Sequence, residues 1–415
     1  LVVGASLIVA AVTGAGAAYV AQGALREASQ GTMQALLETR RNALDGYLSA
    51  IRGDLDMIAE SDVTRDAIRD FRTGWQTLDG EPSGRLQQLY IADNPHPTGE
   101  KHKLDAADDG SAYSAAHRRH HPFFRRFLET RGYYDIFLID LDGNLIYSVF
   151  KELDYATNLQ SGQYAETDLG NAFRAAKAEQ GEAHAFFDFA PYAPSHGAPA
   201  SFISRPVLSK TGEKLGALVY QMPIDRLNAV MQDTAGMGET GDTFIVGTDE
   251  LLRSDARTLE GSEILDLSFR NTAVTRALDG ESGAAQVSGI AGQPVLATFA
   301  PLDFLGTRWA VVTQKALSEI DAPVVRLLWT LAGIVLVAGV IVTVAGLVMA
   351  RGISGPIVAI TEAMKALAAE DKQIQVPGRD RRDEIGDMAG ALDVFKTNAL
   401  EKDRLEAEQK EAEKR

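Results

Sequence analysis

The chain has 415 residues, of which 45% are hydrophobic and 24% are charged, and its formal net charge is -16. This length and composition predict about two or three folded domains. The acidic balance, without a long basic stretch, argues against nucleic-acid binding. Cysteine is absent, which excludes a disulfide framework, a thiolate metal site and a cysteine nucleophile.

The first segment, residues 1–22, carries no charge and is predicted to be a transmembrane helix. A cleaved signal peptide is the alternative, because Ala15-Gly16-Ala17 has the small-x-small pattern of a cleavage site. We favour a retained helix because the uncharged run exceeds the ~7–15 residues of a signal-peptide core.

Residues 23–320 are predicted to form a folded domain that begins with one long helix over 24–71. In this helix Leu44, Leu48, Ile51 and Leu55 follow a heptad-like spacing. Such a seam packs on the chain's own domain or forms a parallel coiled coil with a second copy. Both interpretations remain open on the sequence alone.

The next stretch, residues 72–121, is rich in Gly, Pro, Asp and His and is predicted to be irregular loop with short helix. It contains a cluster of histidines, namely His96, His102, His117, His120 and His121. A zinc site and a pH response near 6.5 are possible roles for such a cluster. We favour a solvated surface, because the metal spacing lacks a clear carboxylate partner, and we predict no metal and no cofactor.

Strand patterns then predict a distal module over about 72–230. Asp142-Gly143 lies between two β-rich runs and predicts a hairpin of Tyr134–Ile139 and Leu145–Phe150. A helix over Asp168–Glu179 and three strands near 183–189, 200–207 and 215–222 are expected to follow. The order is hairpin, helix and three-stranded meander.

A similar order repeats over about 238–316 and predicts a proximal module. Its expected elements are strands at 242–246 and 251–254, a helix at 272–278, and strands at 283–287, 295–300 and 309–314. Two successive modules of one plan indicate a tandem sensor of the α+β class rather than one large catalytic domain.

The second membrane helix is predicted over 324–350. Its uncharged core, Leu327 to Ala350, corresponds to about 36 Å of helix, enough to cross a hydrocarbon layer of about 30 Å. Arg351, Arg379, Arg381 and Arg382 follow it. By the positive-inside rule this side is cytoplasmic, which places residues 23–320 outside the cytoplasm.

Residues 351–403 show two short heptad patterns joined by a connector. Ile353, Ile357, Ile360 and Met364 form the first pattern, and Ile385, Met388, Leu392 and Phe395 form the second. Two such helices complete a parallel four-helix bundle when two chains pair. Asp383 is a plausible N-cap of the second helix, and Glu384 favours the positive end of its dipole.

Several segments in order resemble the double Cache periplasmic domain of bacterial methyl-accepting chemotaxis proteins. They are Gly132–Asp140, Tyr147–Glu152, Asp188–Pro194, Gln221–Asp225 and Gly241–Gly247. The resemblance implies two tandem PAS-like Cache modules on a long N-terminal helix, flanked by two transmembrane helices.

Residues 351–403 resemble a HAMP linker, and Asp383-Glu384-Ile385-Gly386 matches its acidic motif. The resemblance implies a parallel four-helix bundle in a homodimer, with Pro356, Asp383, Glu384 and Gly386 as signalling positions. Residues 404–415 are expected to begin a cytoplasmic signalling helix that is truncated here.

The Cache resemblance implies a small-molecule ligand in the distal module. The amino-acid-binding branch of the family uses an Arg and a Trp-Tyr pair, and the comparable stretch here, Arg174 to Phe187, has no tryptophan. Tyr192 and Asp225 match that branch by position. The full set of candidate ligand residues is Tyr147, Arg174, Asp188, Tyr192, Phe202 and Asp225. Core packing of the aromatics, helix capping by Asp225 and a solvated Arg174 are the alternatives.

The sequence therefore predicts a transmembrane chemoreceptor of the bacterial inner membrane that relays a conformational signal, and not an enzyme. Its expected partners, through a C-terminal domain beyond residue 415, are a chemotaxis coupling protein and a histidine kinase. The stretch Val394–Lys402 resembles chemoreceptor linkers and favours this output. The alternative is the sensor half of a membrane-bound histidine kinase or nucleotide cyclase. A periplasmic structural or adhesion protein would leave residues 351–403 unexplained.

Overall fold

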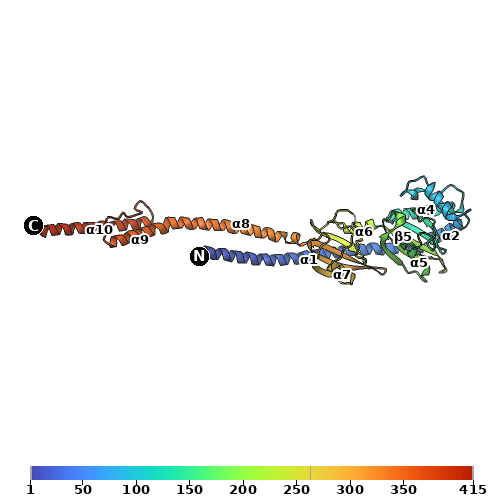
Figure 1. Ribbon diagram of the computed structural model, residues 1–415, viewed down its shortest axis with the longest axis horizontal. Helices are drawn as coiled ribbons and strands as arrows, with labels where there is room; N and C mark the ends of the chain where they lie inside the picture. The colour runs from blue at the N-terminus through green and yellow to red at the C-terminus, as the bar shows by residue number, and fades with distance from the viewer. Residues whose placement is uncertain (1, 262, 414–415) are drawn as a thin grey trace. The chain divides into compact units, whose positions relative to one another are not determined.

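The computed structural model describes residues 2–261 and 263–413. The chain forms two compact units, one from Gly23 to Ala322 and one that combines the segment up to Gln22 with Pro323 onward. The first unit contains two antiparallel sheets, which form the distal and the proximal module (Figure 1). The predicted α+β fold class is confirmed.

Helix α1 (Val2–Ala59) ends just before Ser61, whose Oγ accepts the backbone N–H of Thr64 at 3.1 Å. This hydrogen bond caps a new helix, α2 (Asp62–Gln76). The single helix predicted over 24–71 is therefore wrong, because a side-chain cap starts a second helix at this point. The predicted seam of α1 is buried within the chain itself, as packing on its own domain requires.

The region predicted to be mostly irregular also contains a long helix. Short helices come first: α3 (Pro82–Gln87), η1 (Gln88–Ala92) and η2 (Lys101–Lys103). Helix α4 (Ala112–Arg131) then runs for 20 residues, with Ser111 as its side-chain cap. Its histidines and Pro122 obscured the apolar stripe of Tyr113, Phe124 and Leu128, which are all buried.

The distal sheet has the strand order β2-β1-β5-β4-β3, and every neighbouring pair is antiparallel. Its strands are β1 (Asp135–Asp140), β2 (Leu145–Ser148), β3 (Ala185–Pro191), β4 (Pro199–Leu208) and β5 (Lys214–Met222). Helix α5 (Asp168–Ala178) lies between β2 and β3 in the chain, and η3 (Ala193–Ser195) follows β3.

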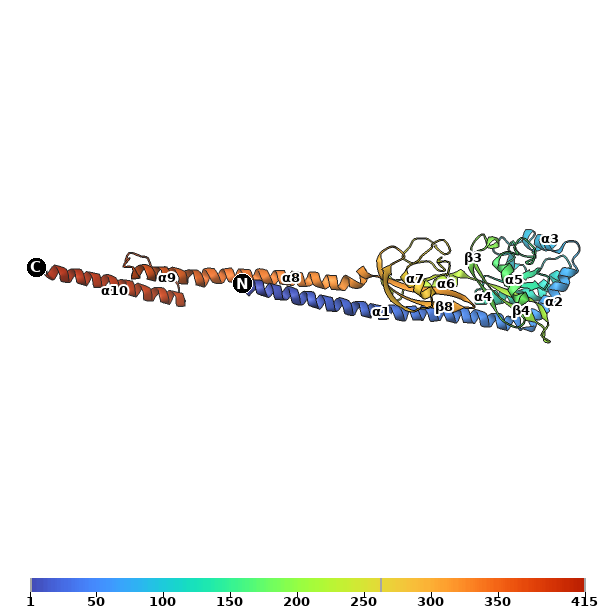
Figure 2. The same ribbon diagram turned by 60° about the horizontal axis from the view of Figure 1, so that its bottom comes forward.

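Helices cover both faces of this sheet (Figures 1 and 2). Side chains of α1, α2 and α4 pack with Ile136, Leu138 and Tyr220 on one face. Side chains of α5 pack with Phe137 and Phe202 on the other face. Because side chains alternate along a strand, Asp135 shares the α5 face with Phe137.

Helix α6 (Ile224–Met231) leads from the distal to the proximal module. The proximal sheet has the order β6-β9-β8-β7, and α7 (Thr272–Leu278) packs on it. Its strands are β6 (Asp242–Val246), β7 (Gly283–Ser288), β8 (Pro294–Phe304) and β9 (Thr307–Ala316). The strand predicted at 251–254 is wrong, because Leu251 and Leu252 make isolated bridges only.

The second unit is helical. Helix α8 (Leu317–Met349) enters it at Pro323 and is followed by η4 (Ala350–Ser354), α9 (Gly355–Ala368) and α10 (Glu384–Glu413). The α9–α10 pair has its own apolar core, which includes Ile360, Val376 and Leu392. Two helical stretches, Ile8–Ala59 and Leu317–Ala368, are long and apolar enough to cross a membrane.

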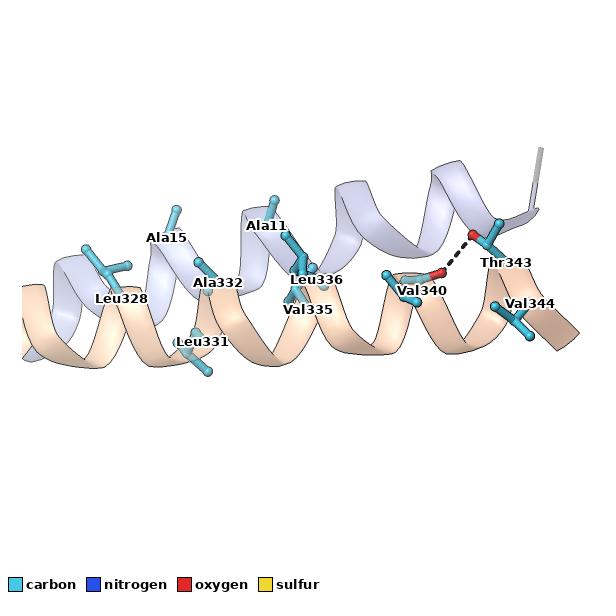
Figure 3. A pocket seen from close by; sticks show the side chains of 13 residues that line it. Ala11, Ala15, Leu328, Leu331, Ala332, Val335, Leu336, Val340, Thr343 and Val344 are labelled. Atoms are coloured by element: carbon cyan, nitrogen blue, oxygen red, sulfur yellow. Dashed lines mark hydrogen bonds between the residues drawn. The ribbon is translucent and has the colours of Figure 1, made fainter.

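An apolar groove of about 700 Å³ runs between residues 10–15 of α1 and residues 328–344 of α8 (Figure 3). Alanine, leucine and valine side chains line most of it, and the hydroxyl of Thr343 donates to the carbonyl oxygen of Gly339 at 2.8 Å. A groove of this composition suits helix packing or lipid tails and offers little to a polar ligand.

Candidate functional site

A cluster of buried polar side chains lies at one edge of the distal sheet, on the α5 face. Asp135 opens β1 and is paired in register with Gln221 of β5, which is in turn paired with Phe202 of β4. Cross-strand partners place their side chains on the same face within about 5.5 Å at Cβ. The side chains of Asp135 and Gln221 are therefore neighbours, and both are buried.

Asp135 is fixed by the loop that follows β2. Its Oδ1 accepts backbone N–H groups from Ile136 at 2.7 Å, Val149 at 2.8 Å and Phe150 at 3.2 Å. Its Oδ2 is buried and has no hydrogen-bond partner within the described part of the chain. One oxygen thus holds the loop in place, and the other is buried without a partner in the described chain.

Asp154 comes from the same loop and is fully buried. Its Oδ2 accepts the hydroxyl of Tyr192 at 2.6 Å, whereas its Oδ1 lacks a partner among residues 2–261 and 263–413. The amide of Gln221 donates from Nε2 to Ser195 Oγ at 3.3 Å, and its Oε1 is likewise unpartnered in the described chain. We call Asp135 Oδ2, Asp154 Oδ1 and Gln221 Oε1 the open acceptors.

Glu152 closes the cluster toward solvent. Its two carboxylate oxygens accept hydroxyl hydrogen bonds, from Ser195 at 2.6 Å and from Tyr134 at 2.8 Å. Beyond it lies a cavity of about 120 Å³ whose lining includes Phe150, Lys151, Glu152, Leu153, Pro194 and His196. None of the residues that carry the open acceptors lines this cavity.

Burial makes the cluster electrostatically unusual. Removal from water and the nearby charges of Asp154 and Glu152 raise the pKa of Asp135 well above its usual range. Burial, opposed by the Tyr192 hydrogen bond and reinforced by Glu152, raises the pKa of Asp154 to about 7. A buried acceptor without a hydrogen-bond partner costs about 1–3 kcal/mol.

Lys151 lies on the other side of the loop and is also buried. Its backbone has φ 58°, and its Nζ donates to the carbonyl oxygens of Ser148 at 3.1 Å and Val149 at 2.9 Å. The ammonium stands 5.4 Å from the ring centroid of Tyr147, a favourable cation–π position. Burial lowers the pKa of Lys151 to about 7.

Two of the six candidate ligand residues meet in this cluster. Tyr192 bonds to Asp154, and its ring packs edge-on against Phe202 with centroids 5.0 Å apart. Both rings also belong to the apolar core beneath α5. They are thus core residues and neighbours of the polar cluster at the same time.

The other four candidates lie elsewhere. Tyr147 packs on the opposite face, where its hydroxyl is 2.7 Å from His121 Nδ1. Arg174 donates to the carbonyl oxygen of Ala165 and to Asn171 on its own helix, both at 2.5 Å. Asp188 contacts the proximal module, and Asp225 is exposed in the first turn of α6. The spacing of these residues in the sequence does not show which face of the sheet each one occupies, so it could not predict which of them lie together.

The sequence interpretation missed Asp135, Asp154 and Gln221 as site residues. A signal was present in Lys151-Glu152-Leu153-Asp154, where three charged residues follow the second strand of a buried hairpin. A charged residue is seldom fully buried without a specific purpose. Gln221 carries no such signal, because its burial depends on pairing with a strand more than 80 positions earlier in the chain.

The histidine cluster is not a solvated surface, contrary to expectation. His117, His120 and His121 are buried on α4, and His117 and His121 lie with ring centroids 4.4 Å apart. Burial lowers the pKa of His117 well below its usual value and that of His121 to about 2. These two rings stay neutral near pH 6.5, which removes them as sensors in that range. Within the described residues no group of three or more His, Cys, Asp and Glu side chains could hold a metal ion.

The family model described as Cache domain (dCache_1) matches residues 21–324. The chain belongs to the Cache domain family. A HAMP domain model matches residues 348–401 of the same Cache-family chain. The predicted resemblance to a double Cache sensor followed by HAMP is confirmed.

A curated relative, "Probable chemoreceptor y4sI" of Sinorhizobium fredii, is 26% identical over 324 residues. The match covers 75% of this chain and 39% of the relative, so the chain spans about two fifths of the length of that protein. The Cache-family chain therefore has a chemoreceptor among its homologues.

Two solved structures show likeness to the Cache unit. The ligand-binding domain of the Pseudomonas aeruginosa amino-acid chemoreceptor PctC in complex with GABA is 12% identical, with TM-score 0.41, and covers 69% of this chain and 99% of that one. The sensory domain of the Campylobacter jejuni chemoreceptor Tlp3 is 13% identical, with TM-score 0.42, and covers 72% of this chain and 98% of that one.

Proposed function

We propose that this chain is the sensory and relay part of a transmembrane chemoreceptor, homodimeric in the bacterial inner membrane, that binds a small ligand in its distal module. The open acceptors carry this proposal. Asp135, Asp154 and Gln221 present buried polar atoms without hydrogen-bond partners, on strand ends and on a short loop. Residues 150–153 of the same loop line a cavity. Perturbed, buried titratable groups beside a cavity are the usual mark of a functional site.

The membrane arrangement supports the same role. Two apolar helical stretches flank the Cache domain, and HAMP follows the second. Arginines 351, 379, 381 and 382 follow the uncharged run of residues 327–350 and favour a cytoplasmic HAMP, which puts the Cache unit in the periplasm. The ligand then acts by its differential affinity for two conformations of the receptor.

A direct path from the pocket toward the membrane also supports a relay. Strand β3 holds Asp188, which contacts Arg253 and Trp309 of the proximal module, and leads within four residues to Tyr192 of the pocket. Strand β9, which holds Trp309, continues into α8. Ligand binding that shifts Tyr192 would therefore move contacts that end on a membrane helix.

The output is proposed to be chemotaxis, through a coupling protein and a histidine kinase bound by a domain beyond residue 415. The chemoreceptor relative of Sinorhizobium fredii favours this output. A membrane-bound histidine kinase or nucleotide cyclase is the alternative, since a Cache sensor and HAMP are equally suited to precede either catalytic domain.

The test is a thermal-shift screen of the whole chain in lipid nanodiscs against amino acids, amines, organic acids and divalent metal ions. A ligand that binds the folded state raises the melting temperature with its concentration. We expect at least one compound to do so, and Tyr192→Phe to weaken the effect. If no compound shifts the wild-type chain, direct sensing of these compound classes is excluded.

A further inference from the structure

A groove of about 470 Å³ lies between α1 and α6, the helix that leads from the distal to the proximal module. It belongs to the compact unit Gly23–Ala322. Its lining includes Ala43 of α1 and Ala229 of α6, whose small side chains leave space between the two helices. The volume lies in the range of about 300–1,000 Å³ that small-molecule sites occupy. The described lining contains none of the six candidate ligand residues of the distal module, so the groove is a separate feature.

Two side chains that line the groove carry unused hydrogen-bond donors. Arg40 is 4% exposed, and its Nε has no hydrogen-bond partner within residues 2–261 and 263–413. The hydroxyl of Tyr47 is likewise buried and unpartnered in the described chain. A tyrosine hydroxyl stays protonated at neutral pH and can donate. Both groups therefore call for an acceptor.

Arg226 of α6 adds a cation beside these two donors. It is exposed, and its guanidinium carbon stands 5.7 Å from the centroid of the Tyr47 ring. No described residue pairs with it by a hydrogen bond or an ion pair. A guanidinium presents its donors in a planar fork that matches a carboxylate or a phosphate. The contact with the Tyr47 ring keeps this fork beside the groove.

The charges of the lining favour a small anion. Arg40 and Arg226 contribute two positive charges and Asp233 contributes one negative charge, which leaves a net charge of +1. One oxygen of Asp233 already accepts the backbone N–H of Ala235 at 3.0 Å. The unused groups are N–H and O–H donors. An oxyanion accepts such hydrogen bonds, whereas a cation cannot.

Arg40 also connects the groove to the end of α6. Its Nη1 donates to the carbonyl oxygens of Val230 at 2.6 Å and Met231 at 3.0 Å, and its Nη2 donates to the carbonyl oxygen of Asp233. A cation that satisfies the last carbonyl groups of a helix caps it. Helix α6 follows β5 of the distal sheet and precedes β6 of the proximal sheet. An anion held in the groove therefore joins the helix between the two modules to α1.

We propose that the groove between α1 and α6 is a second ligand site, which binds a small oxyanion (a carboxylate, phosphate or sulfate group) through Arg226, Tyr47 and Arg40. Because Arg226 lies over the Tyr47 ring, we expect the anion to draw the exposed guanidinium aside and to reach the buried hydroxyl. Occupancy strengthens the contact between α1 and α6. The site acts on the joint between the modules and does not depend on the ligand of the distal module.

The experiment is calorimetry on the whole chain in nanodiscs with sodium acetate, phosphate and sulfate, each compared with sodium chloride at matched ionic strength. We expect at least one oxyanion to bind more tightly than chloride. Arg226→Gln should weaken that binding roughly tenfold or more, because it removes the charged fork. Tyr47→Phe keeps the ring and removes the hydroxyl, and it should weaken binding roughly threefold.

Two further variants separate a defined site from a general effect of charge. Arg52→Gln removes an exposed arginine of α1 that lies outside the groove, and it should leave binding unchanged. Asp233→Asn removes the negative charge of the lining and keeps Oδ1 as an acceptor for Ala235. It should tighten binding severalfold, because the anion no longer faces a like charge. Damage to the fold would not produce tighter binding.

Each contrary result overturns the proposal in a different way. Binding no tighter than that of chloride removes the oxyanion site. Binding that survives both Arg226→Gln and Tyr47→Phe, or that Arg52→Gln weakens equally, places the anion elsewhere. Binding that Tyr192→Phe weakens assigns the anion to the distal module. Absence of binding together with loss of the homodimer in Arg226→Gln, measured by analytical ultracentrifugation, shows that a second copy of the chain covers the groove.

Discussion

The carboxylate of Asp188 in the distal module accepts two hydrogen bonds from the guanidinium of Arg253 in the proximal module, at 2.9 and 3.1 Å. The indole N–H of Trp309 donates to the same oxygen at 3.0 Å. Arg253 and Trp309 are buried. A single carboxylate oxygen thus joins the two modules through a desolvated contact, and Asp188 has a defined role other than ligand binding.

We expect Asp188→Ala to destabilise the Cache unit by on the order of 3 kcal/mol, because it leaves the buried guanidinium with Asp249 as its remaining carboxylate partner. Urea unfolding followed by circular dichroism measures the change. The control is Asp303→Ala, which removes an exposed pair with Arg308 and should cost less than about 1 kcal/mol. Similar losses in the two variants would show that the inter-module contact is not special.

The buried histidines should make the fold sensitive to acid. The pKa of His121 is lowered to about 2, mainly by burial and next by the charge of Lys151. A lowered pKa means that, as the pH falls, the unfolded chain binds this proton before the folded chain does. The stability linked to neutral His121 is therefore fully present above pH 6.5 and is lost as the pH falls toward 2. We expect His121→Gln to lose less stability than wild type between pH 6.5 and 4.5. The exposed His196→Gln should keep the wild-type slope.

Asp154 should act in the opposite direction. Its pKa is raised to about 7, chiefly by burial, and Glu152, Asp135 and Tyr192 face it. A raised pKa means that the folded chain keeps this proton to a higher pH than the unfolded chain does. The stability that Asp154 contributes therefore falls as the pH rises from about 4 to about 7. The stability of Asp154→Asn relative to wild type should therefore increase over that range and level off above pH 7. A constant difference from pH 4 to 8, measured by urea unfolding, would contradict the raised pKa.

The start of the second HAMP helix depends on a glycine. Asp383 Oδ1 accepts the backbone N–H of Gly386 at 3.2 Å, and a Cβ at Gly386 would lie 2.2 Å from the carbonyl oxygen of Arg381. We expect Gly386→Ala to destabilise the α9–α10 pair by about 1–3 kcal/mol, as overpacking does. Gly390→Ala, where no described atom apart from the neighbouring backbone of its own helix lies within 4 Å of the added methyl group, should instead stabilise the helix slightly. Thermal unfolding of the two variants in nanodiscs gives the comparison.

Local patterns predicted much of the fold. The Asp142-Gly143 turn, the strand runs other than 251–254 and the uncharged helix of residues 327–350 are patterns of neighbouring residues, and the structure forms them. The break at Ser61 and the helix α4 were missed, because one hydroxyl cap and a row of buried histidines carry little periodic signal. These are cases in which tertiary burial decides the local structure.

The candidate site was less accessible to sequence reasoning. Tyr192 was found because it matches the amino-acid-binding branch by position, and Phe202 because it is an aromatic residue on a predicted strand. Asp135 and Gln221 become a site only through the pairing of β1 with β5, which no spacing rule reveals. Asp188 and Asp225 were plausible by residue type, and only the packing of the modules separates an inter-module contact from an exposed helix turn.

One ion pair has a consequence for engineering. Arg26 near the start of the Cache unit and Asp321 near its end lie 295 positions apart, and their side chains meet at 2.5 Å. A domain whose entry and exit points are adjacent can be cut out and inserted elsewhere without stretching its host. Residues 23–322 can therefore be transferred as one unit. The Arg26–Asp321 ion pair marks the two positions at which this unit could be joined to the membrane helices of another receptor to give a hybrid with a different sensor domain.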